Sequence, residues 1–180
     1  GENASERFRY IGIDRKIAML PQVRFLKGDA KIDDELELFV IQNRSHELPF
    51  TNKRLLVRTG EEYRRDEFGH EQFLVIHQNE KSILMSGCAH NGILSILDAY
   101  AARYGKAPDL VVSGFHLMKK TDYRDGEMEE IRAIAEELKK YPTKFVTCHC
   151  TGMIAYDVMK NIMGDRIEYV HSGEEVRNIK

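Results

Sequence analysis

The second half of the chain repeats one unit, a short apolar run followed by an amphipathic segment of helical length. Strands are expected at Ser82–Ser86, Asp109–Ser113, Lys144–Thr147 and Arg166–Val170. Helices are expected between them, over Asn91–Tyr104, over Gly126–Lys140, and from Thr151 to near Gly164. Alternation of strand and helix is typical of a sheet with parallel strands and packed crossover helices. The sequence therefore predicts an α/β fold from residue 82 onward.

The ends of these helices carry recognisable signals. Gly105 follows the first helix and can take the left-handed conformation that ends it. Asp125 and Thr151 are the expected N-caps of the second and third helices, because their side-chain oxygens can accept from free backbone N–H groups.

The first half reads as short strands separated by turns. They are expected at Phe8–Ile13, Val23–Leu26, Leu36–Ile41 and Phe73–Ile76. Gln78–Lys81 should close a hairpin between the last of these and Ser82–Ser86. The charged, irregular segment Glu47–Gly69 is expected to form an exposed excursion or lid that selects the substrate.

Composition limits the classes of function. The 180 residues carry a net charge of −2, which gives no basic footprint for a stable nucleic-acid partner. No apolar run approaches the roughly 20 residues needed to cross a bilayer, so we expect no membrane segment. Three cysteines argue against a disulfide framework and for the cytoplasm. Because the chain opens on Gly1, we expect that a longer protein was trimmed at its front.

Three successive predicted strands each run into a loop that holds one histidine. The histidines are His90, His116 and His149. Such sheets bind ligands at the carboxyl ends of their strands, so the loops should cluster. Gly87, Gly114 and Gly152, one in each loop, would allow sharp turns and close backbone approach. Imidazole is a common zinc ligand, and the pattern predicts part of a metal site.

Other readings remain for the histidines and cysteines. A single histidine after a strand is more often a hydrogen-bonding loop residue, and only the repetition favours a metal site. His171 repeats the position a fourth time but is taken as structural or peripheral, while His46, His70 and His77 are taken as surface or edge residues. Cys88, Cys148 and Cys150 are interpreted as small buried residues beside the site, with a nucleophilic Cys88 as the alternative. A zinc knuckle is disfavoured because the sequence has no second ligand pair.

At these loops the sequence resembles the metallo-β-lactamase superfamily. It is most similar to the branch that includes dihydropterin-linked ribofuranosyl-aminobenzene phosphate synthases, with the motifs G-C-[SA]-H-x-G-I, G-G-F-H-L and H-C-T-G. The matching segments are Gly87–Ile93, Ser113–Leu117 and His149–Gly152, and Asp66–Gln72 resembles the segment that leads into the first motif. Ser113 replaces the more usual glycine. Three motifs in order are more specific than any one.

The resemblance implies roles for the histidines. His90 and His149 correspond to metal ligands of the family. His116 stands where many members place a bridging aspartate, and is expected either to bind metal or to act catalytically by binding substrate or donating a proton. The complete protein would hold two metal ions, zinc with manganese or iron as alternatives, and a bridging hydroxide would attack a small-molecule substrate of unknown type.

One family hallmark, H-x-H-x-D-H, occurs nowhere in the sequence. We therefore interpret residues 1–180 as one partial domain, the C-terminal half of an αββα fold, with a mixed sheet and helices on one face. The expected function is a metal-dependent hydrolase that is inactive as the isolated chain. The alternatives are a non-catalytic scaffold or subunit and a small-molecule-binding domain. The uncovered sheet should favour a homo-oligomer or pairing with the missing N-terminal half.

Overall fold

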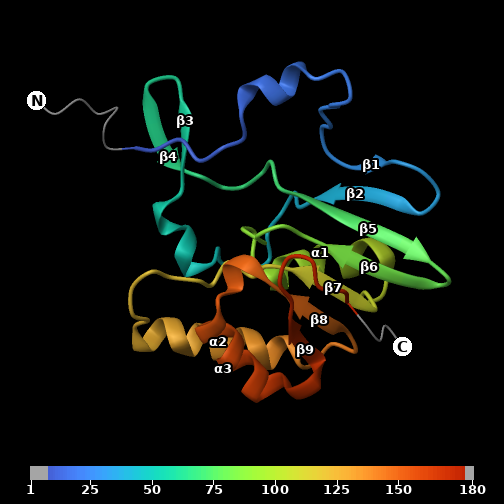
Figure 1. Ribbon diagram of the computed structural model, residues 1–180, viewed down its shortest axis with the longest axis vertical. Helices are drawn as coiled ribbons and strands as arrows, with labels where there is room; N and C mark the ends of the chain where they lie inside the picture. The colour runs from blue at the N-terminus through green and yellow to red at the C-terminus, as the bar shows by residue number, and fades with distance from the viewer. Residues whose placement is uncertain (1–7, 177–180) are drawn as a thin grey trace, which may run out of the picture.

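The computed structural model describes residues 8–176, which form a seven-stranded mixed sheet, a small hairpin and three α-helices (Figure 1). The sheet has the order β1-β2-β5-β6-β7-β8-β9. Its strands are β1 (Ala30–Lys31), β2 (Leu36–Val40), β5 (Gln72–Gln78), β6 (Lys81–Met85), β7 (Leu110–Ser113), β8 (Lys144–Thr147) and β9 (Ile167–Tyr169). Pairing is antiparallel from β1 to β6 and parallel from β6 to β9.

The three helices connect the four parallel strands. They are α1 (Ile93–Tyr104), α2 (Asp125–Leu138) and α3 (Met153–Met163). Each connection advances by one strand in the same direction, and right-handed crossovers then place all three helices on one face. The core lies between this face and the helices, and includes Val75, Leu84, Ile96, Tyr100, Val111, Ile131, Phe145 and Met159. The predicted mixed sheet with helices on one face is confirmed.

The turn and helix-end predictions are partly confirmed. Gly105 is left-handed with φ of 70° and ends α1. Asn79 and Glu80 close the β5–β6 hairpin with φ of 52° and 63°, the paired positive values of a type I′ turn. The N-cap predictions were wrong: Arg124 precedes α2 and its N–H donates to the Glu127 carboxylate, and Gly152 precedes α3.

The segment before β1 departs from the sequence prediction. Phe8–Ile13 and Val23–Leu26 form no strand, and η2 (Arg15–Met19), a short 3₁₀ helix, lies between them. The apolar side chains are exposed, among them Met19 at 84% and Phe25 at 72%. Alternation alone misled the prediction here, because a strand also needs a neighbour that completes its hydrogen bonds.

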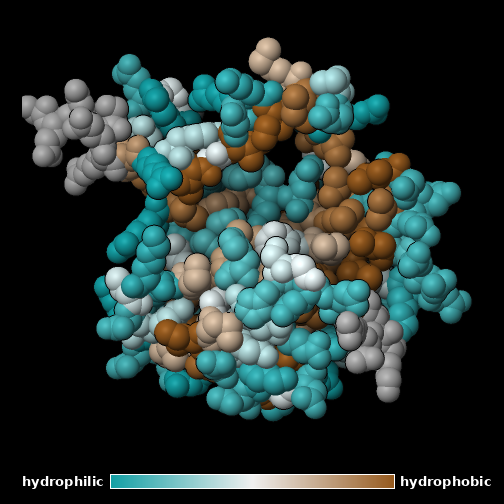
Figure 2. Space-filling model, viewed as in Figure 1, coloured by the Kyte–Doolittle hydropathy of each residue, from teal (hydrophilic) through white to brown (hydrophobic). Residues whose placement is uncertain are grey.

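The sheet face opposite the helices is apolar and only partly covered. Leu38, Leu74 and Met85 lie side by side across three strands in the pairing register, as do Leu36, Ile76 and Ile83. Each of these side chains is half-buried. Figure 2 shows brown side chains gathered over β1, β2 and β5. No helix within residues 8–176 is long and apolar enough to cross a membrane.

Candidate metal centre

The loops after β6, β7 and β8 converge at one edge of the sheet, as the strand pattern predicted. Backbone hydrogen bonds join them directly. The Gly114 N–H donates to the Gly87 carbonyl (2.9 Å), and the N–H groups of Leu117 and Met118 both donate to the Cys150 carbonyl (3.0 and 2.8 Å). Three histidine loops that are distant in sequence are therefore held in fixed relative positions.

Two glycines make this approach feasible. A Cβ on Gly114 would lie 2.6 Å from the Cys150 sulfur, and one on Gly152 would lie 2.9 Å from the Met118 side chain. Gly152 also has φ of 73°. At Gly87 a Cβ would meet nothing within 4 Å, so the approach of Gly114 to the Gly87 carbonyl does not require glycine at position 87.

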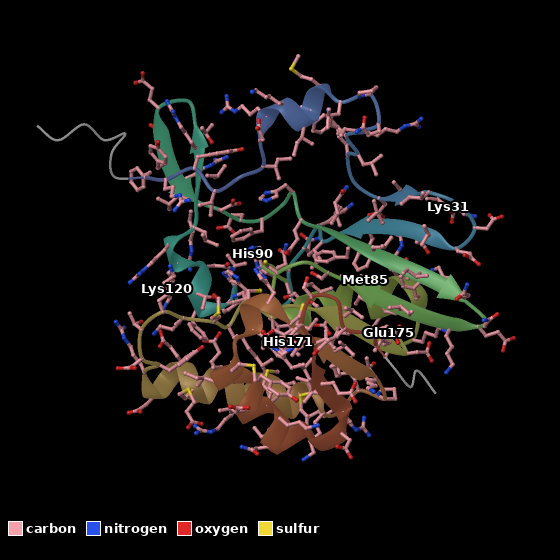
Figure 3. All side chains as sticks on the ribbon, viewed as in Figure 1. Lys31, Met85, His90, Lys120, His171 and Glu175 are labelled. Carbon is pink, nitrogen blue, oxygen red and sulfur yellow. The ribbon has the colours of Figure 1, made fainter. Side chains whose placement is uncertain are left out.

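His90 and His116 face each other at the centre of the cluster. Their ring centroids lie 4.1 Å apart at an interplanar angle of 53°. The Phe68 ring stacks on the other side of His90, at 4.4 Å and 4°. Figure 3 shows His90 where the N-terminal part of the chain meets the β7–α3 part.

Each histidine loop contains a residue other than glycine in the left-handed region. Ala89 has φ of 54°, His116 of 50° and His149 of 49°. This conformation costs on the order of 1–3 kcal/mol per residue and concentrates at functional sites. Its recurrence in all three loops indicates that side-chain placement, rather than local backbone preference, determines their shape.

Cys88 lies between the histidines. Its sulfur forms one group of mutually close donor atoms with His90 and His116, and a second group with His149 and Cys150; within each group the atoms lie within 4.8 Å of one another. The Cys88 Sγ is 3.6 Å from His149 Nδ1. The three predicted histidines are thus brought together, but around a thiol that the sequence analysis placed beside the site.

The three thiols differ in charge state. The Cys150 thiol and the rings of His116 and His90 stabilise the Cys88 thiolate and lower the pKa of Cys88 to about 2. The neighbouring Cys88 thiolate raises the pKa of Cys150, and burial raises the pKa of Cys148. Cys150 is buried, whereas Cys88 and Cys148 are half-buried, which corrects the expectation of three buried cysteines. Cys88 is therefore the thiol poised to bind a cation.

The donor set fits a transition-metal ion. Both ring nitrogens of His116 are buried and lack a hydrogen-bond partner among the described residues. A buried nitrogen without a partner costs about 1–3 kcal/mol, unless a ligand such as a metal ion satisfies it. Imidazole nitrogen and thiolate sulfur are preferred zinc ligands. His116 could therefore serve as a ligand, one of the roles expected of it.

A short 3₁₀ helix, η3 (Phe50–Arg54), supports two of the loops. The buried Asn52 donates from its amide nitrogen to the His90 carbonyl (2.7 Å), and its amide oxygen lies 3.0 Å from His90 Nδ1. Thr51 donates to the His116 carbonyl. Because the Asn52 oxygen faces Nδ1, that nitrogen carries the proton, and Nε2 remains free to bind a metal.

The Glu71 side chain fixes the loop after β6, which holds His90. Its two carboxylate oxygens accept from the N–H groups of His90 (2.7 Å) and Asn91 (2.8 Å). Arg44 donates to the Asn91 side chain (3.2 Å) and pairs with Glu67 (2.7 Å). Sequence reasoning missed Asn52, Thr51 and Arg44, since no motif surrounds them; Glu71 lies within the segment that resembled the family.

The segment Glu47–Gly69 is only partly the exposed lid that was expected. The hairpin of β3 (Leu56–Thr59) and β4 (Glu62–Arg65) is largely exposed. Phe50, Asn52 and Phe68 are buried. Phe68 stacks on His90, Asn52 donates to the His90 carbonyl, and the Phe50 ring lies against Tyr123 in the loop after His116. The segment is therefore in part a wall of the site.

The remaining histidines lie outside the cluster. His46 is paired with Asp98 (3.0 Å) and His77 with Glu37 (2.7 Å), and His70 is exposed. His171, which Figure 3 labels, is exposed on the turn after β9, and its Nδ1 lies 3.3 Å from the Glu174 carboxylate. These positions agree with the surface, edge or peripheral places expected for them.

No family model matches the chain, but comparison with known proteins gives distant relatives. A 7,8-dihydropterin-6-methyl-4-(beta-D-ribofuranosyl)-aminobenzene-5'-phosphate synthase of Methanocaldococcus jannaschii is 31% identical over 114 residues, covering 62% of this chain and 35% of that protein. An uncharacterized protein of the same organism is 25% identical over 170 residues, covering 92% and 60%.

The crystal structure of Tm1679, a metal-dependent hydrolase of the beta-lactamase superfamily, superposes with a TM-score of 0.65 at 30% identity. The match covers 86% of this chain and 58% of that one. The chain therefore has the mixed α/β fold of a beta-lactamase-superfamily hydrolase, and spans about 60% or less of the length of each of these relatives. The resemblance read from the three motifs is confirmed.

Proposed function

We propose that this chain contributes the metal-binding loops of a metal-dependent hydrolase whose substrate is a small molecule. One observation carries the proposal: the loops after β6 and β7 bring Cys88, His90 and His116 together, and both ring nitrogens of His116 lack a hydrogen-bond partner within residues 8–176. The similarity to a metal-dependent hydrolase of known structure supports the same reading.

The side chains would divide the work as follows. His90 Nε2 and His116 would hold the ion, Asn52 would keep the proton on His90 Nδ1, and His149 would approach from the Cys88 side. When bound, such an ion lowers the pKa of a coordinated water to about 7 and takes up charge that develops on the bond under attack. His116 could alternatively contact the substrate or transfer a proton. Zinc suits imidazole and thiolate donors best, with manganese or iron as alternatives.

Substrate and setting are proposed more coarsely. The charged hairpin of β3 and β4 directly follows η3, which carries Thr51 and Asn52, and would contact the substrate. Three free thiols favour a reducing compartment such as the cytoplasm. Neither the donor set nor the fold selects the bond, so esters, thioesters, lactams and phosphodiesters are all candidates.

The test combines metal content with turnover. The 180-residue chain is dialysed against Zn²⁺ and its metal content is measured, and the natural gene product is assayed against a panel of ester, thioester, lactam and phosphodiester substrates. We expect bound zinc that His90→Gln and His116→Gln remove, and turnover that a chelator abolishes. His171→Gln is the matched control, since it alters an exposed histidine outside the cluster.

Two outcomes would overturn the proposal. Zinc content unchanged in both histidine variants would make these histidines structural. Bound zinc without turnover of any substrate class would favour the alternative, a non-catalytic scaffold or subunit with the same fold.

A further inference from the structure

The geometry points to a thiolate ligand in this metal site: we propose that Cys88 binds the same ion as His90 and His116. This inference deepens the proposed function, on which it rests, because it specifies the donor set and hence the class of metal. The donor atoms of these three residues lie within 4.8 Å of one another. Tetrahedral zinc with bonds of roughly 2.0–2.3 Å needs donors somewhat closer than this, so small side-chain rotations are enough to close the site.

Cys88 belongs to a second close group, with His149 and Cys150, and three observations favour the first. Both ring nitrogens of His116 are buried and have no hydrogen-bond partner in the described part of the chain. The Asn52 oxygen holds His90 with its Nε2 free. His149 is exposed, whereas His90 and His116 are both half-buried, so the first group is the better enclosed around its nitrogen donors.

The three ligands leave a position open for water. One sulfur and two nitrogens match the three-ligand pattern of catalytic zinc sites. Thiolate is a soft ligand, so the site should prefer Zn²⁺, Co²⁺ or Fe²⁺ over Mn²⁺ and Mg²⁺. Binding forms a metal–sulfur bond; any proton on the sulfur passes to solvent, and no electrons are transferred.

Two further features place Cys88 in this role. It lies two residues before His90 in a loop that Glu71 and Asn52 fix through backbone hydrogen bonds, so sulfur and imidazole are positioned together. Cys148, on a neighbouring loop, belongs to neither close group within the described residues. Cys148 therefore provides a matched control for the loss of a thiol near the same site.

The experiment is a Co²⁺ titration of the 180-residue chain, followed by absorption. Cobalt bound to a thiolate gives a near-ultraviolet charge-transfer band, and cobalt bound to histidine alone gives none. We expect the band in the unaltered chain and in C148S and C150S, and its loss in C88S. The affinity of C88S should fall by more than the roughly 10–100-fold that loss of a supporting residue costs.

A second measurement avoids any variant that fails to fold. Bound Zn²⁺ should slow alkylation of Cys88 in the unaltered chain by at least about tenfold, while Cys148 is alkylated at the same rate with and without metal. Circular dichroism of each variant establishes that its fold is retained.

The outcomes separate this inference from the proposed function. Cobalt bound without the band, or a band that survives in C88S, overturns the thiolate ligand and leaves a histidine metal site standing. Loss of the band in C150S as well as C88S overturns the assignment in favour of the second group. A chain that binds neither cobalt nor zinc overturns both proposals.

Discussion

The region from β6 to β9 and the region before β5 are built by different rules. The first contains most of the buried apolar side chains, under three helices that cover one sheet face. The second exposes large apolar side chains from Tyr10 to Ile32, and among its described residues only Phe39, Phe50 and Phe68 join the buried hydrophobic set. Regular repetition organises the first region, whereas individual contacts such as Asn52 with His90 hold the second. The candidate metal centre lies where the two meet.

Removal of one ring from each region tests whether the two regions contribute equally to stability. Phe145→Ala deletes a fully buried ring and should lower the free energy of unfolding by about 3–5 kcal/mol. Phe25→Ala deletes a ring that is 72% exposed and should change it by less than about 0.5 kcal/mol. Urea denaturation followed by circular dichroism measures both. Equal losses in the free energy of unfolding would show that the segment of residues 8–29, before β1, packs as firmly as the core.

The contact between the regions is tested at Asn52. Asn52→Ala removes two hydrogen bonds to His90 and should lower the free energy of unfolding by about 1–3 kcal/mol. Zinc affinity should fall by roughly 10–100-fold, since the His90 tautomer is no longer fixed. Calorimetric zinc titration measures the affinity, with the exposed Asn43→Ala as control. Unaltered affinity in Asn52→Ala would mean that the second region does not orient the ligand.

The pH dependence of thiol reactivity should distinguish Cys88 from Cys148. The pKa of Cys88 is lowered to about 2, so in the metal-free chain its thiolate persists down to acidic pH. The pKa of Cys148 is raised, so its thiolate appears only at alkaline pH. Alkylation from about pH 5 to about pH 9, followed by mass spectrometry, should give a nearly flat rate for Cys88 and a rising one for Cys148. A Cys88 rate that climbs with pH like that of Cys148 would contradict the assignment.

The smallest expected effect concerns association. We propose that two apolar surfaces support a homo-oligomer or pairing with a further segment of the protein. They are the exposed side chains of residues 8–29 and the sheet face opposite the helices. Light scattering of the 180-residue chain should show a mass that rises with concentration, and F25S combined with M19S should reduce it. The control, I154S, alters an apolar residue of α3 that is 59% exposed. A concentration-independent monomer would count against oligomerisation through this surface.

An element was predicted more accurately when several independent sequence signals agreed on it. Strands β6 to β9 and helices α1 to α3 were placed within a few residues, since apolar period, helix stops and alternation all agreed. Phe8–Ile13 and Val23–Leu26 were predicted wrongly as strands, because alternation was their only support. Arg124, rather than Asp125, precedes α2, because the Glu127 carboxylate accepts from the Arg124 N–H and the helix begins one residue earlier than expected.

The candidate site divides in the same way. The apolar pattern predicted the strand ends that carry His90, His116 and His149, and so predicted their meeting at one edge of the sheet. The position of Cys88 between them, and the contacts of Asn52 and Thr51 from a segment about 40–65 residues away, became visible in the folded chain alone. Strand and helix periodicity is local, whereas a hydrogen bond between distant loops depends on how the whole chain packs.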